Sequence, residues 1–220
     1  MRRGISRLCH FTRSSHLPHI VESGILPRDL LDADRAAVFT PTDDLRLDAH
    51  RNCVCCSVEY PNAWYLDRAM ANERIYRDWV VIFVSAHYLW DPNTLYCPRN
   101  AAANRGAEIK SGLDGFQRMF ADDVAGSQGI VRGRSGLHLP CCATDDQAEV
   151  LVPGSIPVSD ILGIAVATVT QARNELVRLR LSGSTGFRVP LVVAPALFSK
   201  NQLRDEIRRG VRPVEEPYAG

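Results

Sequence analysis

Trp79-Val80-Val81-Ile82-Phe83-Val84 is a continuous apolar run that no charged residue interrupts. A strand with one face in water alternates apolar and polar residues, whereas a strand covered on both faces is apolar throughout. The run therefore predicts a central strand with other elements packed on both sides of its sheet.

A second apolar run begins with a charge. In Gln147-Ala148-Glu149-Val150-Leu151-Val152, a carboxylate stands at the start of what reads as a buried strand. Asp and Glu are almost never fully buried without a partner. Glu149 therefore has either a structural partner or a chemical role.

Shorter elements surround these two strands. Further strands are predicted at residues 8–12, 52–60, 161–168 and 191–194, and helices at 14–24, 64–77, 100–103, 113–120, 171–181 and 199–209. Residues 28–50 and 121–146 are predicted to be loops, and the tail at 213–220 to be loose. Strands mixed irregularly with helices favour the α+β class, here as one domain over residues 1–220.

Composition places the chain among ordinary globular proteins. It has 220 residues, a net charge of +1, 45% hydrophobic and 23% charged residues. No apolar stretch approaches the length of a membrane span, and no apolar segment follows the basic start as in a secretory signal. We expect a cytoplasmic protein without a membrane partner.

Cysteine usage agrees with a reducing compartment. The chain has seven cysteines, an odd number, and two pairs, Cys55-Cys56 and Cys141-Cys142, are adjacent. This spacing makes a poor disulfide framework, and no C-x-x-C pair is present to bind zinc. We expect the cysteines to act as small buried apolar residues, and we expect no metal site.

Three short motifs occur in a defined order. His10-Phe11-Thr12 precedes a short helix that ends at Gly24, Asn100-Ala101-Ala102 follows, and Ala148-Glu149-Val150-Leu151-Val152 comes last. In this order and spacing the chain resembles the DarT family of DNA ADP-ribosyltransferase toxins. The resemblance implies the split, mixed β-sheet core of ADP-ribosyltransferases with flanking helices. It also implies NAD+ as co-substrate, single-stranded DNA as acceptor, and a cognate antitoxin that is an ADP-ribosyl hydrolase.

The resemblance assigns roles to individual residues. Glu149 matches the catalytic glutamate, which would act beside an oxocarbenium-like ribose as NAD+ breaks. His10 matches an NAD+-binding histidine, assisted by Thr12 and by Gly24 at the end of the helix. Arg51 matches the arginine of the catalytic and cofactor site, and Arg46 is close enough in sequence to be its counterpart.

The acceptor site is predicted from aromatic and basic residues. The segment from Ser57 to Tyr65 resembles the guanosine-modifying branch more than the thymidine-modifying one, so guanine is favoured and thymine is possible. Stacking on a base is the predicted role of Tyr60, Trp64 and Tyr65, although such aromatics are more often core residues. Contact with the nucleic-acid backbone is the predicted role of Arg118, Arg132 and Arg134.

Other functions fit the same residues. The chain could transfer ADP-ribose to RNA or protein, or act as an RNA 2′-phosphotransferase. It could also be a catalytically inert nucleic-acid-binding module in which Glu149 is only structural. Loss of transfer in Glu149→Ala would separate the enzymes that depend on this carboxylate from the inert module.

Overall fold

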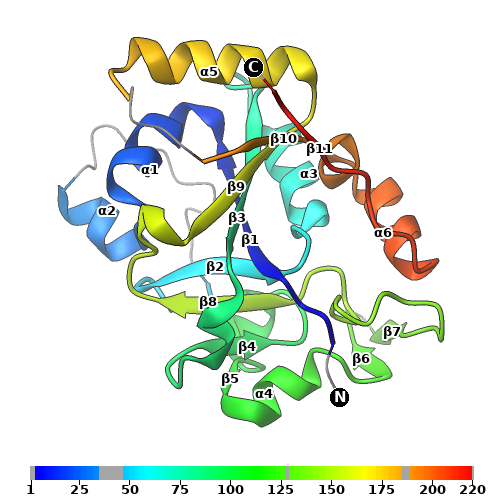
Figure 1. Cartoon of the computed structure of the whole chain (residues 1–220). Coiled ribbons are helices and arrows are strands. Elements are labelled where there is room, and N and C mark those ends of the chain that lie inside the picture. The colour runs from blue at the N-terminus through cyan, green and yellow to red at the C-terminus, as the bar shows by residue number, and fades with distance from the viewer. Residues whose placement is uncertain (1–2, 35–46, 127–128, 185–188, 220) are drawn as a thin grey trace.

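The computed structural model describes residues 3–34, 47–126, 129–184 and 189–219. Strands and helices alternate irregularly along the chain and gather around one large sheet (Figure 1). The strands are β1 (Arg7–Arg13), β2 (Cys53–Val58), β3 (Trp79–Ser85), β4 (Leu95–Cys97), β5 (Lys110–Ser111), β6 (Asp123–Ala125), β7 (Val131–Gly133), β8 (Glu149–Pro153), β9 (Ile161–Val166), β10 (Leu191–Val193) and β11 (Glu216–Pro217).

Helices connect and cover these strands. The α-helices are α1 (Leu17–Ser23), α2 (Arg28–Asp34), α3 (Ala63–Asn72), α4 (Gly112–Arg118), α5 (Val169–Leu181) and α6 (Lys200–Arg208). Short 3-10 helices are η1 (Ser14–His16), η2 (Ala86–Trp90), η3 (Ala103–Gly106), η5 (Val158–Asp160) and η6 (Pro195–Phe198).

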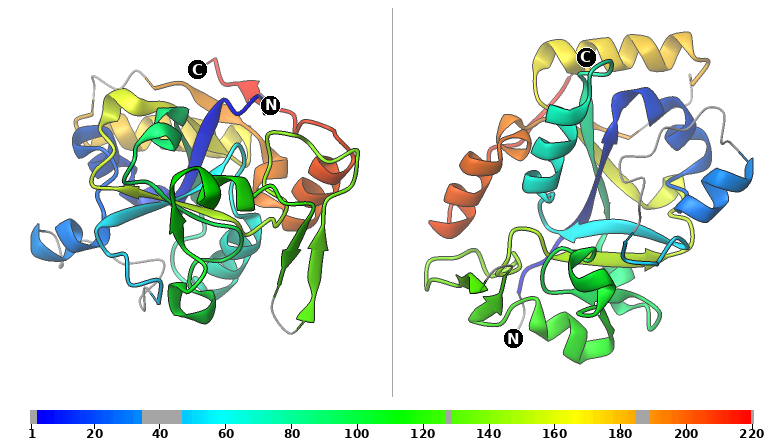
Figure 2. Two further views of the ribbon diagram at one scale, coloured as in Figure 1. Left: turned by 90° about the horizontal axis from the view of Figure 1, so that it is seen from below. Right: turned by 180° about the vertical axis from the view of Figure 1, so that it is seen from behind.

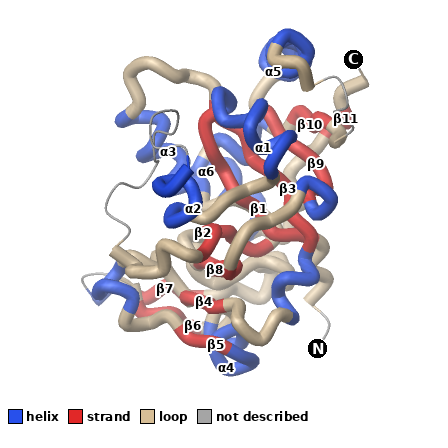
Figure 3. The backbone as a smooth tube through the Cα atoms, turned by 90° about the vertical axis from the view of Figure 1, so that its left-hand side faces the viewer, coloured by secondary structure: helices blue, strands red, loops and turns tan. Residues whose placement is uncertain are grey.

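The main sheet is split between β1 and β2. Its strand order in the described residues is β11-β10-β9-β3-β1-β2-β8-β4-β5, and only β9 and β10 pair in parallel. β1 pairs with β3 over its whole length, from Arg7 to Arg13, but with β2 only through Leu8 and Cys9. Two groups of strands therefore share a short ladder, and Figure 3 shows one group above the other. This confirms the predicted α+β fold with a split, mixed sheet.

The central strand is β3, as the apolar run predicts. Val80, Ile82 and Val84 face one hydrophobic cluster, to which α1 and α5 contribute, while Val81 and Phe83 face a second cluster with α3 and α6. Both faces are therefore covered, and this is why no polar residue alternates with the apolar ones. Figure 1 shows α5 across one end of the molecule.

Several predicted loops contain regular structure. α2 occupies the start of the region 28–50, of which residues 35–46 lie outside the described part of the chain. The hairpin β6–β7 forms inside the predicted loop 121–146 and projects from the body (Figure 2, left). Strands of three residues next to glycines carry too weak a periodic signal to be recognised in the sequence.

Two predicted helices have different limits. α3 ends at Asn72 rather than at residue 77, because Glu73 adopts an extended backbone and its carboxylate accepts the backbone N–H of Ile75 at 2.9 Å. At 100–103 the chain forms a turn, and η3 begins only at Ala103.

The C-terminal tail, predicted to be loose over residues 213–220, contacts the sheet through residues 215–218. β11 pairs with β10, and Glu215 forms an ion pair with Arg7. Arg212 donates to the buried carboxylate of Glu59 at 3.0 Å. These contacts with distant parts of the sequence hold the tail against the sheet. Within the described residues, no helix is both long enough and apolar enough to cross a membrane.

Candidate active site

Glu149 is the first residue of β8, at the point where a buried strand reaches the surface. The next residues, Val150 and Leu151, are fully buried, whereas Glu149 is half-buried. Its Oε1 accepts a hydrogen bond from the backbone N–H of Ala101 at 3.3 Å, and its Cα pairs with that of Cys97 on β4. The Ala101 N–H therefore fixes a carboxylate on a half-buried residue at the start of a buried strand.

His10 lies where β1 and β2 separate. The two strands pair only at Leu8–Val58 and Cys9–Ser57. Beyond this point the Cys55 carbonyl faces the gap, and His10 Nδ1 lies 2.9 Å from its oxygen. Because a carbonyl only accepts, Nδ1 must carry the proton, which assigns the tautomer of a neutral ring. The histidine thus bridges the split in the sheet.

A second histidine supports Thr12. The Thr12 hydroxyl, on a 6% exposed residue, lies 2.8 Å from His16 Nδ1. Burial lowers the pKa of His16 to about 4, and the nearby Arg13, His10 and His19 add to this effect. His16 is therefore neutral at physiological pH. The contact of His16 with Thr12 was not predicted, because a single histidine after a strand does not indicate a functional role in the sequence.

His10 and Glu149 lie on opposite sides of β2. The register pairs Cys9 with Ser57 on one side of β2, and Cys56 with Val150 on the other. Continuing these registers by one position aligns His10 with Cys56 and Glu149 with Ser57. β2 therefore lies between the strand that carries His10 and the strand that carries Glu149.

Arg51 lies near the opposite end of β2. Cys53 pairs with Pro153 at the far end of β8, four positions along β2 from Ser57, which is about 13 Å at the usual rise of a strand. The Arg51 guanidinium, 48% exposed, forms an ion pair with Asp32 on α2. The backbones of Arg51 and Glu149 therefore lie toward opposite ends of β2, and a catalytic role of Arg51 stays a prediction. Arg46 lies outside the described residues.

Gly24 ends α1 with a positive φ of 78°. A Cβ at this position would lie 2.2 Å from the Ile156 carbonyl oxygen. Ile25 and Ile156 also form an isolated antiparallel bridge. Close approach of two backbones therefore requires glycine here, and a contact between Gly24 and a cofactor stays a prediction.

The three aromatic residues differ in exposure. Tyr60 is 5% exposed and lies under the guanidinium of Arg7, 5.4 Å from its ring centre. Trp64 and Tyr65, at the start of α3, are half-buried. Lys200 Nζ and the guanidinium carbon of Arg204 lie 5.0 and 5.5 Å from a ring centre of Trp64. Trp64 and Tyr65 can therefore meet a ligand, whereas Tyr60 packs in the core.

The predicted backbone-contacting arginines also differ. Arg134 donates to the carbonyl oxygens of Cys142 and Leu139, each at 2.8 Å, so it ties together the segment before Glu149. Arg132 is half-buried on the projecting hairpin, and Arg118 is on α4. The sequence analysis did not select Lys200 and Arg204 as residues that could contact a ligand beside Trp64. Their i,i+4 spacing on a predicted helix places them on one face of it.

No group of three or more His, Cys, Asp or Glu side chains lies close enough to hold a metal ion in the described ranges.

Comparison with known proteins identifies a matching family. A model described as "ssDNA thymidine ADP-ribosyltransferase, DarT" matches residues 9–199. No curated protein matches the chain.

Solved structures share the fold. Thermosipho africanus DarTG in complex with ADP-ribose is 16% identical with a TM-score of 0.60; the match covers 88% of this chain and 51% of that one. This chain thus spans about half of that DarTG chain. Thermus sp. 2.9 DarT in complex with NAD+ is 14% identical with a TM-score of 0.59, over 89% of this chain and 98% of that one. The same protein in complex with ADP-ribosylated ssDNA is 15% identical with a TM-score of 0.54, and the match covers 88% of this chain and 96% of that one. At these identities the likeness concerns the fold.

Proposed function

Since the chain belongs to the DarT family of single-stranded DNA ADP-ribosyltransferases, we propose that it transfers ADP-ribose from NAD+ to a base in single-stranded DNA. The observation that carries the proposal is the half-buried carboxylate of Glu149, which the Ala101 N–H holds at the start of a buried strand. In the reaction the bond between nicotinamide and ribose C1 breaks, and a base nitrogen bonds to C1 and loses its proton.

Glu149 is the proposed catalytic residue. The transition state carries positive charge on the ribose, as in glycoside hydrolysis. A carboxylate fixed beside the ribose stabilises that charge and orients the sugar for attack by the base. Alternatively, Glu149 has only a structural role, in which its carboxylate caps the turn at Ala101. Activity measurements on Glu149 variants separate the catalytic role from the structural one.

NAD+ is the proposed co-substrate, and the relatives crystallised with NAD+ support it. His10 and Thr12 are the proposed binding residues, because they follow the point on β1 where its ladder with β2 ends. Arg51 is proposed to contact NAD+ at the other end of β2. Its present partner, Asp32, is also held by Arg28 at 2.7 Å and can release Arg51 to a phosphate.

The acceptor is proposed to be a base stacked on Trp64 and Tyr65. Stacking contributes about 1–3 kcal/mol per base in single-strand binders, and a single strand leaves the reactive base edge unpaired. Arg132 is the proposed backbone contact. Guanine is the base that the sequence favours, and thymine is the alternative, which the matching family model names.

A toxin–antitoxin role is also proposed. A DarTG relative about twice as long as this chain supports a partner protein. We propose that this partner is an antitoxin that removes ADP-ribose from the modified base. Expression of this chain alone is then expected to be toxic, and co-expression of the hydrolase encoded beside it to relieve the toxicity.

The test is incubation of the purified chain with NAD+ and oligonucleotides, followed by mass spectrometry. The panel contains the four DNA homopolymers, mixed sequences, their duplexes and the matching RNAs. The proposal expects the mass of one ADP-ribose on single-stranded DNA that contains the acceptor base. Modification of RNA or of added protein alone would support the alternative transferases, and no modification with binding intact would support the inert module.

A further inference from the structure

Two adjacent cysteines face one another in the segment before Glu149. The Sγ atoms of Cys141 and Cys142 lie 3.9 Å apart. Both residues are buried, with exposed fractions of 1% and 4%. Adjacent side chains rarely meet, because regular strands and helices direct them away from each other. The irregular backbone of this segment brings the two sulfurs together.

The chain carries a second adjacent pair that serves as a contrast. Cys55 and Cys56 lie on β2, where successive side chains point to opposite faces. Cys56 joins the cluster with Val54 and Val150, whereas Cys55 packs against the cluster around Cys53 and Leu151. Two pairs with the same sequence thus differ in whether their sulfurs can meet.

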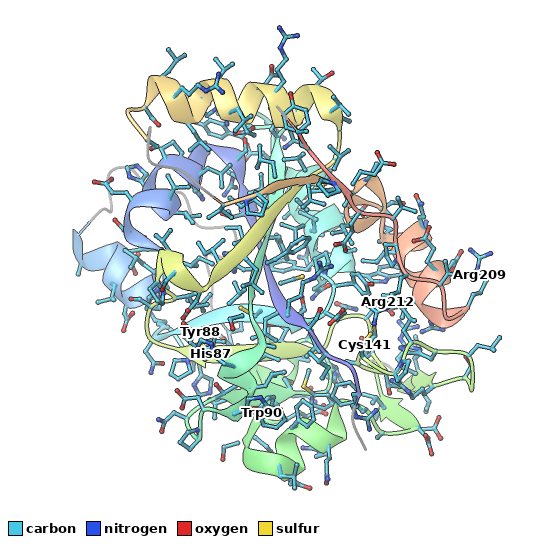
Figure 4. All side chains as sticks on the ribbon, viewed as in Figure 1. His87, Tyr88, Trp90, Cys141, Arg209 and Arg212 are labelled. Carbon is cyan, nitrogen blue, oxygen red and sulfur yellow. The ribbon has the colours of Figure 1, made fainter. Side chains whose placement is uncertain are left out.

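The two thiols at 141–142 are not equivalent. Arg212 Nη2 lies 3.7 Å from Cys141 Sγ, and the two residues are labelled close together in Figure 4. The hydrogen bond from the Cys142 thiol lowers the pKa of Cys141, against burial and the charge of Glu59, which raise it, and the charge of Arg212 adds to the lowering. The same hydrogen bond, together with burial, raises the pKa of Cys142. Because, of the two thiols, the Arg212 guanidinium contacts that of Cys141, this is the thiol whose thiolate, the nucleophilic form, is favoured.

A small molecule has room beside the pair. Cys142 lines a cavity of about 30 Å³ together with Tyr60, Trp64 and Arg204. This volume holds a molecule of about the size of water, and hydrogen peroxide is only slightly larger. The cavity thus reaches the Cys142 side of the pair, next to α6.

We propose that Cys141 and Cys142 form a redox modification site, which oxidants of the peroxide class convert to a vicinal disulfide. The Cys141 thiolate attacks one peroxide oxygen, the O–O bond breaks, and hydroxide leaves and takes up a proton. The Cys142 sulfur then attacks the Cys141 sulfenic acid, the S–O bond breaks, and the Cys142 proton leaves with the second water. In total, two thiols are oxidised to one disulfide and one peroxide is reduced to two waters.

Closure of this bond requires the local backbone to move. Adjacent Cα atoms are about 3.8 Å apart, below the 4.4–6.8 Å span that is usual for a disulfide. The Cys142 carbonyl accepts from Arg134, and its N–H donates to the Leu139 carbonyl at 3.1 Å. Rearranging the peptide between the two cysteines disturbs both bonds. A strained disulfide is also easily reduced, so the modification is reversible.

The same segment leads into Glu149. From Cys142 the chain passes through Thr144, whose N–H donates to the Met119 carbonyl at 2.8 Å, and through the turn at Asp145 that precedes β8. Movement at Cys142 would act on this connection to the start of β8. This consequence rests on the proposed function of Glu149, and we infer that oxidation reversibly lowers ADP-ribose transfer.

The first experiment maps the thiols of the full chain without any activity assay. The reduced protein is treated with hydrogen peroxide, unfolded, alkylated with N-ethylmaleimide and digested for mass spectrometry. The expected result is a peptide with Cys141 and Cys142 that carries no alkyl group and has lost two hydrogens, while Cys55 and Cys56 are both alkylated. The disulfide is expected to be absent in Cys141→Ser. Alkylation of both Cys141 and Cys142, or oxidation only to sulfinic acid, would overturn the proposal.

The second experiment measures transfer to single-stranded DNA before oxidation, after it, and after dithiothreitol. At least a tenfold loss, restored by dithiothreitol and absent in Cys141→Ser, is expected. A disulfide that forms without changing the rate would overturn the inferred control of activity. If the reduced protein transfers no ADP-ribose, the proposed function fails. The thiol map still tests whether Cys141 and Cys142 form a disulfide.

Discussion

The backbone N–H of Ala101 donates a hydrogen bond to Oε1 of Glu149 at 3.3 Å. The two residues are far apart in sequence and meet because β4 pairs with β8, which brings Cys97 opposite Glu149. The turn that presents this N–H is held by Asn100, whose Oδ1 accepts the Ala102 N–H at 2.9 Å. The Asn100-Ala101-Ala102 motif therefore orients the carboxylate through the backbone.

Asn100→Ala is expected to lower kcat for transfer about tenfold with little change in KM, because a misplaced catalytic group loses reactive geometry rather than binding. Asn100→Ser keeps a side-chain acceptor for the turn and is expected to recover most of the rate. Steady-state kinetics with NAD+ and an oligonucleotide make the comparison. Equal kcat in all three proteins would show that the turn does not orient Glu149.

Arg51→Ala is expected to raise KM for NAD+ about tenfold with little effect on folding. An exposed ion pair such as that of Arg51 with Asp32 contributes only about 0–1 kcal/mol to stability, so the melting temperature should hardly change. Arg28→Ala is the matched control, since Arg28 contacts the same carboxylate. Similar KM values for the two variants would contradict a cofactor role for Arg51, and unfolding of Arg51→Ala would indicate a structural one.

Trp64→Leu is expected to raise KM for single-stranded DNA about tenfold, in line with the ~1–3 kcal/mol that a stacked base contributes, and to leave KM for NAD+ unchanged. Trp90→Leu is the control, because Trp90 is 78% exposed on η2, away from α3 (Figure 4). Fluorescence anisotropy with a labelled oligonucleotide measures the binding. Parallel behaviour of the two variants would remove Trp64 from the acceptor site.

His138 makes stability depend on pH. Burial and the nearby Arg134 lower its pKa to about 4 from an ordinary 6.5. Between these values the unfolded chain binds a proton that the folded chain does not, so this contribution to stability is lost as pH falls from about 6.5 to 4. His138→Gln does not titrate and keeps a donor for the Ala143 carbonyl. The free energy of unfolding of His138→Gln minus that of wild type should therefore increase by about 1–2 kcal/mol when the pH is lowered from 7 to 5. Urea titrations at both pH values test this, and a constant difference would contradict it.

The sequence predicts the elements whose signal is local. The apolar run of β3 indicates a strand covered on both faces, and alternate residues of the strand do belong to the two clusters. The position of Glu149 before Val150 likewise predicts a carboxylate on the first residue of a buried strand. Both predictions depend only on the pattern of neighbouring residues.

The features that sequence reasoning missed depend on long-range contacts. β1 and β2 separate after a ladder of only two residue pairs. The residues around His10 in the sequence do not predict this separation. The burial of Tyr60 depends on Arg7, and the contacts of the tail depend on Arg7 and Glu59. Because these partners are distant in sequence, periodicity contains no information about them.

The most direct test of the central claim compares wild type with Glu149→Gln, which keeps the shape of the side chain and removes its charge. Both proteins are incubated with NAD+ and a single-stranded oligonucleotide, and the mass of the DNA is followed over time. We expect the variant to fold and to bind NAD+ as wild type does but to transfer ADP-ribose at least ~10²-fold more slowly. Transfer by Glu149→Gln at the wild-type rate would show that this carboxylate is not catalytic.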